Sequence, residues 1–154
     1  SSGTPTYPIT SGAYTNVYST GMDRVMTFVT KLDPTTPVTL SYSTYLVPGT
    51  GNGIAVDPVT DDAFIVGSTF TFAFPVTTGA LQPMHAGTGN TDGFAVRLNA
   101  AGSALVYSTF LGGYMSDWAT SVATNSAGEA YVVGIYQGTF ANSAGRVQPN
   151  NARH

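Results

Sequence analysis

The stretch FAVRLNAAGSALVYSTFL, from Phe94 to Leu111, decides the fold of this 154-residue chain. Residues 94–98 alternate large apolar side chains with a smaller or charged one, which is the two-residue period of a β-strand. Residues 105–111 carry apolar side chains on both faces of a second strand. Asn99 to Ser103 contain Ala-Ala-Gly and predict the turn that joins the two strands.

The sequence after this stretch continues the β pattern. Thr120 to Ala123 predict a short third strand, and Ala130 to Gly134 predict a fourth that is rich in aromatic and β-branched residues. The segment that precedes the stretch, Phe74 to Thr91, is a connector, because Pro75 and Pro83 have no N–H group to donate within a sheet. No segment of helical length carries a 3.6-residue apolar stripe, so the sequence predicts an all-β fold.

The first half of the chain repeats this plan. Four stretches recur in the same order, each about 66 residues later, which is the mark of stacked structural units. They are YPITSGAY from Tyr7 and FPVTTGAL from Phe74, FVTKL from Phe28 and FAVRL from Phe94, SYSTYL from Ser41 and VYSTFL from Val106, and DAFIVG from Asp62 and EAYVVG from Glu129. In the first unit the matching strands are 28–32, 40–46, 54–56 and 63–67.

The repeat divides the chain into three parts. Residues 1–73 form a first blade-like repeat, residues 74–139 form a second, and residues 140–154 begin a third connector. Four antiparallel strands followed by a connector predict one sheet in each repeat. Apolar residues on both faces of a strand indicate a sheet covered on both sides. Two four-stranded β-propeller-type blades in tandem satisfy this requirement; a β-sandwich is the alternative, and a β-helix needs much shorter coils.

The second unit also resembles a known family. FPVTTGALQP, DGFAVRLN from Asp92, GSALVYSTFLGG from Gly102 and AGEAYVVG from Ala127 are similar to SBBP repeats, which are bacterial β-propeller repeats of large extracellular proteins. The first unit departs from the family, because Val47-Pro48-Gly49-Thr50 replaces the Gly-Gly that follows the second strand. The resemblance implies a propeller scaffold on an exported protein. It implies no catalytic residues and no ligand.

The number of repeats raises the question of partners. Propellers close with about four to eight blades, whereas this chain holds two. Two blades alone would expose large apolar faces, which are rare on soluble monomers. We therefore expect further blades of the same or neighbouring chains to cover them, as a homo-oligomer or polymer that forms a ring or a filament.

Composition narrows the class of protein. Charged residues make up only 8% of the chain, against about 25% in a typical soluble domain. The net charge of −3 and the absence of a basic cluster exclude a nucleic-acid partner. No apolar run approaches the roughly 20 residues of a membrane span. The chain has no cysteine, which excludes disulfides and zinc–thiolate sites but does not indicate a compartment. The composition rich in Thr, Ser, Gly and Tyr and poor in lysine suggests an extracellular or cell-surface location.

Acidic residues offer one candidate site. Asp57, Asp61 and Asp62 cluster around one predicted turn, and hard cations such as Ca²⁺ bind several oxygen ligands. We place a weak cation site at Asp61 and Asp62. No EF-hand spacing is present, and Asp also favours turns because it accepts hydrogen bonds from nearby backbone N–H groups. We otherwise expect no cofactor.

Aromatic residues offer a second candidate site. Trp118 and Tyr114 lie beside Asp117 in a loop that is longer in the second unit, and aromatic rings with a carboxylate can bind a glycan. Packing between blades is the alternative role for these rings. His85 and His154 lack a nearby nucleophile motif. The sequence thus predicts a non-enzymatic structural or interaction module, with a carbohydrate-binding, lectin-like propeller as the alternative.

Overall fold

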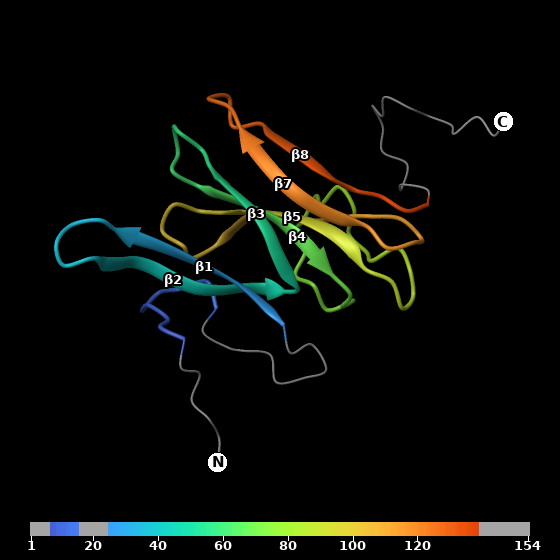
Figure 1. Cartoon of the computed structure of the whole chain (residues 1–154), viewed down its shortest axis with the longest axis horizontal. Coiled ribbons are helices and arrows are strands. Elements are labelled where there is room, and N and C mark those ends of the chain that lie inside the picture. The colour runs from blue at the N-terminus through green and yellow to red at the C-terminus, as the bar shows by residue number, and fades with distance from the viewer. Residues whose placement is uncertain (1–6, 16–24, 139–154) are drawn as a thin grey trace, which may run out of the picture.

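The computed structural model describes residues 7–15 and 25–138, and over this part it is all-β with no helix (Figure 1). None of the described residues forms a helix that could cross a membrane. The predicted start of a third repeat, 140–154, lies outside the described residues. The eight strands are β1 (Met26–Asp33), β2 (Thr39–Pro48), β3 (Thr50–Val56), β4 (Ala63–Thr69), β5 (Asp92–Leu98), β6 (Leu105–Leu111), β7 (Trp118–Thr124) and β8 (Ala130–Ile135).

The prediction of an all-β fold is confirmed, and each predicted strand lies within an observed one. The two-residue period predicts these strands because successive side chains of a strand face opposite sides of its sheet. The largest difference is at β3, which begins at Thr50 although the apolar pattern begins only at Ile54. Residues 50–53 read as a loop because Gly51 and Gly53 carry no side chain, yet their backbone pairs with β4.

The predicted grouping of the strands is wrong. The prediction placed four strands of one repeat in one sheet, whereas the strands form antiparallel sheets of two, four and two, in the orders β1-β2, β3-β4-β5-β6 and β7-β8. The four-stranded sheet takes β3 and β4 from the first sequence unit and β5 and β6 from the second. The connector 74–91 therefore joins two strands of the same sheet. Strand periodicity could not reveal this, because it gives each strand's faces and not its neighbours.

The three sheets lie in layers with the four-stranded sheet in the middle (Figure 1). One face of this central sheet carries Phe94, Val96 and Leu98 from β5 and Ile65 from β4. The β1–β2 pair covers that face with Val29, Tyr42, Leu46 and Val47, which belong to the same buried cluster. This cluster is the larger of the two hydrophobic cores.

The opposite face of the central sheet is covered by β7. Val66 of β4 and Ala95 of β5 pack with Ala119 of β7, and Val122 lies against them. β7 crosses three strands of the sheet, β3, β4 and β5. Because both faces are covered, every residue of β4 is buried. The expected two-sided burial is thus met by β4 and β5, whereas Val106 of β6 is half exposed.

Connectors pack on the sheets in the same way in both sequence units. Thr10 donates its N–H to the carbonyl of Ser43 at 3.0 Å, and Thr77 donates to the carbonyl of Ser108 at 3.2 Å. The Ser43 and Ser108 N–H groups each return a hydrogen bond to the threonine hydroxyl, at 2.9 Å in both cases. Residues 7–15 therefore lie on β2 as the connector lies on β6.

The layers predict unequal roles for two equivalent phenylalanines. Phe94 is fully buried in the central sheet, whereas Phe28 of β1 is 55% exposed. Phe94→Ala should lower the free energy of unfolding by about 3–5 kcal/mol, because it leaves a cavity in the core. The matched variant Phe28→Ala should cost the monomer about 1 kcal/mol or less. Urea unfolding of dilute protein measures both, and equal losses would contradict the layered arrangement.

Candidate interaction surface

Each of the two outer sheets has two strands, which is half the number in the central sheet. β1 pairs only with β2, and β8 pairs only with β7, among the strands that the structure describes. By sequence, β1 is equivalent to β5 and β8 is equivalent to β4. In the central sheet β4 and β5 pair directly with each other along their whole length. Each outer pair therefore has one strand, β1 or β8, with no described strand along one edge. The same edges of the equivalent strands, β5 and β4, are paired with each other in the central sheet.

Burial follows the same division. In the central sheet Phe94, Leu98, Phe64 and Val66 are each at most 1% exposed. The side chains at the equivalent positions of the outer sheets are mostly in solvent: Phe28 55%, Leu32 59%, Tyr131 61% and Val133 61%. Apolar residues that occupy core positions but lie in solvent mark a surface for association.

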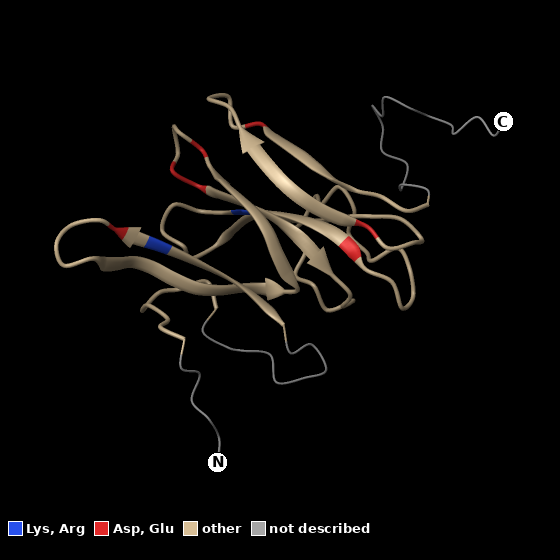
Figure 2. Ribbon diagram, in the orientation of Figure 1, with Lys and Arg blue, Asp and Glu red and all other residues tan. Residues whose placement is uncertain are grey.

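Charged residues are sparse on the two outer strand pairs, β1–β2 and β7–β8 (Figure 2). They lie mainly near strand ends and turns, and long stretches of strand carry none. Edge strands are usually protected from association by charges or prolines. β8 contains no charged residue and no proline, and β1 contains one lysine and a terminal aspartate. Neither edge is well protected in this sense.

The β4–β5 pairing is reinforced by one partly buried cation, Arg97. The Nε of Arg97 donates to Asp62 at 2.8 Å, and its Nη2 donates to Asp57 at 3.3 Å. The guanidinium also lies over the ring of Phe64, 4.9 Å from its centroid. Asp57 accepts the Val59 N–H at 2.8 Å, and this bond, with the Arg97 charge, lowers the pKa of the Asp57 carboxyl.

These contacts occupy the carboxylates that were predicted to bind a cation. Asp62 accepts from Arg97 and from the Ala100 N–H at 2.9 Å, and Asp61 forms an ion pair with Lys31. The Lys31 hydrogen bond to Asp61 raises the pKa of the lysine. Among the described residues, no three His, Asp or Glu side chains are grouped to hold a metal ion. A cation site at Asp61 and Asp62 stays a prediction.

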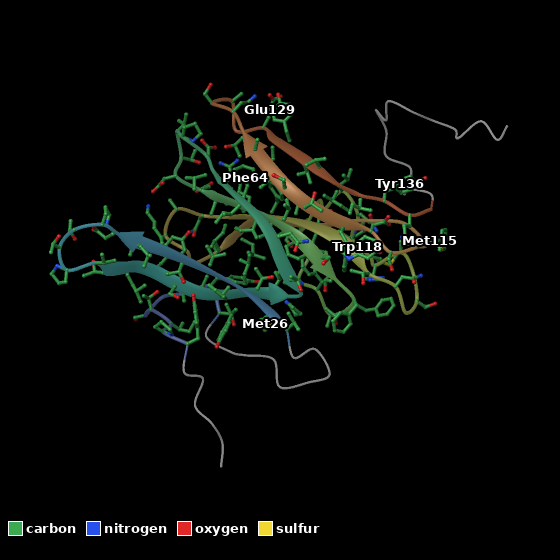
Figure 3. The ribbon with its side chains drawn as sticks, in the orientation of Figure 1. Met26, Phe64, Met115, Trp118, Glu129 and Tyr136 are labelled. Carbon is green, nitrogen blue, oxygen red and sulfur yellow. The ribbon has the colours of Figure 1, made fainter. Side chains whose placement is uncertain are left out.

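The predicted glycan-binding residues lie together, but they differ in exposure. Tyr114 is largely exposed, whereas Asp117 is buried. The Asp117 carboxylate accepts the N–H groups of Gly113 at 2.5 Å and Gln137 at 2.6 Å. It therefore holds the loop before β7 against the residues after β8. Figure 3 places Trp118, Met115 and Tyr136 at this end of the β7–β8 pair and Glu129 at the other end.

A buried polar cluster was missed by the sequence analysis. Asp92 Oδ2 accepts the Ala86 N–H at 2.9 Å and the Gln82 amide at 3.2 Å, and Gln82 in turn accepts the Gly112 N–H at 2.9 Å. His85 lies 3.9 Å from Asp92, with both side chains fully buried. No sequence pattern joins His85 to Asp92, because the connector from Phe74 to Thr91 has no regular period that would place its side chains.

The cluster fastens the connector to β5 and β6. Asp92 Oδ1 and both ring nitrogens of His85 have no hydrogen-bond partner in the protein. Burial therefore raises the pKa of the Asp92 carboxyl, and the Ala86 N–H offsets this only in part. The hydrogen bonds from Ala86 and Gln82 to Asp92 hold the connector against β5.

The raised pKa of Asp92 predicts a pH dependence of stability. The contribution of Asp92 to the free energy of unfolding is fully present at pH values below the ordinary Asp pKa of 3.8, and it is lost as pH rises through the pKa of the folded state. The difference in unfolding free energy, wild type minus Asp92→Asn, should therefore decrease between pH 4 and pH 7. Asp57→Asn is the control with the opposite sign, because the folded pKa of Asp57 is lowered. The stabilising contribution of Asp57 is present above the ordinary Asp pKa of 3.8 and is lost as pH falls below that value, so its difference should stay nearly constant between pH 4 and pH 7 and decrease at lower pH. Urea unfolding from about pH 2 to pH 7 measures both differences, and the same pH dependence for both would contradict the assignment.

Comparison with known proteins gives no match to a family model and no significant match to a curated protein. The similarity to SBBP repeats stays a prediction from the quoted motifs.

Proposed function

We propose that the protein is a non-enzymatic structural module that associates, through sheet faces and strand edges, with further sheets of the same kind. These sheets come from adjacent repeats of a longer chain or from other copies of this one, and the product is a ring or a filament. One observation carries the proposal: side chains at equivalent positions are buried in the central sheet and exposed in the two outer pairs.

The sheets suit the blades of a propeller. The central sheet has four antiparallel strands in sequence order, and its neighbours stack on its two faces. This is how propeller blades pack around their axis. A sandwich would need only two stacked sheets, whereas three layers are already present and both outer ones are incomplete. The blade assignment agrees with the family resemblance and is part of the proposal.

We place the module outside the cell, on the surface of the organism that makes it. Support comes from the composition, which is rich in Thr, Ser, Gly and Tyr and poor in lysine, and from the resemblance to repeats of exported proteins. A structural role is supported by the way acidic side chains are used. Asp57, Asp62, Asp92 and Asp117 all accept hydrogen bonds from backbone N–H groups, so they organise loops.

Self-association can be measured directly on the purified chain. Burial of the exposed outer faces favours assembly, so light scattering should show a mass that rises with concentration above that of the 15.9 kDa monomer. Electron microscopy of the same samples then separates closed rings from filaments. A soluble monomer that persists at high concentration would rule out the proposed function.

The glycan-binding alternative makes a different prediction. Trp118→Ala should leave assembly unchanged, because association through β1 and β8 does not need the indole ring. If the protein instead bound sugars, the same variant should lose glycan-array signals that the wild type gives. Sugar binding that depends on Trp118, in a protein that does not assemble, would favour the lectin-like function.

A further inference from the structure

We infer that the free edge of β8 pairs with the free edge of β1 from a second copy, so that β7, β8 and the second copy's β1 and β2 form one four-stranded sheet. The inference deepens the proposed function, on which it rests, by naming the partner, the two strands and their register. It follows from a pairing already present in the molecule. β4 and β5, the equivalents of β8 and β1, form the middle of the central sheet.

The β4–β5 pairing supplies the register. In it Ala63 lies opposite Leu98, Phe64 opposite Arg97, and Ile65 opposite Val96. We call the pairing of β8 with β1 of a second copy the seam. When the β4–β5 register is transferred to the equivalent residues, the seam places Ala130, Tyr131 and Val132 opposite residues of the second copy. Their respective partners are Leu32, Lys31 and Thr30. Within residues 7–15 and 25–138 no strand pairs with either edge, and an unpaired edge favours the addition of a strand.

The space for the incoming strand is present. An open groove of about 450 Å³ lies between β1 and β3, lined by residues 25–30, residues 49–54 and Ile65. In the complete part of the molecule, β7 packs across β3, β4 and β5. β3 is the equivalent of β7 in the first sequence unit, and it packs against β1, the equivalent of β5. No described strand pairs with the other edge of β1, where the equivalent of β4 would lie. A β8 strand paired with β1 would occupy this groove and pack on β3, as β4 packs on β7.

One seam covers both exposed faces. In the monomer, the β1–β2 pair covers Phe94 and Leu98 of the central sheet, and β7 of the β7–β8 pair covers Val66. A composite sheet would lie between the central sheets of two copies. Phe28 and Leu32 of the second copy would then pack against the first copy. Tyr131 and Val133 of the first copy would pack against the second, and all four of these side chains are exposed in the monomer.

Charge complementarity favours the same register. Lys31 is equivalent to Arg97, and Glu129 is equivalent to Asp62, the carboxylate that receives the Arg97 Nε. They are the only lysine and the only glutamate of the chain. Lys31 already pairs with Asp61 of its own chain, and the seam adds Glu129 and Tyr131 of the other copy to its neighbours. Arg97 likewise contacts two carboxylates, Asp57 and Asp62, and the ring of Phe64. Because β8 is joined to β1 and not to another β8, the contact is head to tail and can repeat.

A charge exchange tests the seam on the full chain. Lys31→Glu and Glu129→Lys should each raise the concentration needed for assembly by about tenfold or more, because like charges then face each other. An equimolar mixture of the two single variants should assemble again, since every mixed junction joins opposite charges. The double variant K31E/E129K should also assemble. Val106→Glu is the control, because Val106 is an exposed apolar residue of β6 outside the seam.

The outcomes separate this inference from the proposed function. If the wild type assembles and both single variants assemble at the same concentration, the seam is wrong and association through the apolar faces still stands. If the wild type stays monomeric, the proposed function fails and the seam fails with it. If the single variants are impaired but their mixture is not rescued, the predicted charge pair is wrong.

Engineered cysteines test the register. The natural chain has no cysteine, so any disulfide must join the introduced residues. Val132→Cys combined with Thr30→Cys places the two thiols directly opposite, with Cβ atoms about 5 Å apart. Oxidation of assembled protein should give a ladder of covalent multimers. Val132→Cys combined with Leu32→Cys, two residues out of register, should give little or none, and a ladder of equal intensity would overturn the register.

Discussion

The antiparallel pairing of β4 with β5 is the constraint on which the structure depends. It joins the end of one sequence unit to the beginning of the next, and it holds the 74–91 connector against the sheet that the connector itself links. Without it the chain would be a row of two-stranded hairpins, which are marginal in water. Arg97 strengthens the pairing because its guanidinium contacts two carboxylates and a ring from the β4 side.

The central sheet is stable because it is covered twice. One face is packed by the β1–β2 pair and the other by β7, so β4 is buried along its whole length. In the described part of the chain the outer pairs have no second cover, and their equivalent side chains lie in solvent. Few charges are present to keep such faces apart. The same physical rule, that an apolar strand must be covered on both faces, therefore accounts for the core and for the proposed association.

Polar residues in this molecule mostly maintain backbone geometry. Asp117 fastens the loop before β7, Asp92 and Gln82 fasten the connector, and Asp57 and Asp62 order the turns beside Arg97. A carboxylate that already accepts several short bonds is less available to a ligand. Large apolar side chains of the outer sheets, among them Phe28, Leu32 and Tyr131, are left exposed. This distribution suits a protein whose proposed role is to build an assembly with copies of itself.

The sequence by itself determined the strands and their matching halves. Residues 94–98 and 105–111 show their period without any tertiary information, because alternate side chains must face opposite sides of a sheet. Tertiary structure alone decided which strands are neighbours and which carboxylates meet a cation. β4 pairs with β5 across a long connector, and Asp62 meets Arg97 across the same seam. No local pattern contains these contacts, because pairing depends on which edges and faces the rest of the fold leaves uncovered.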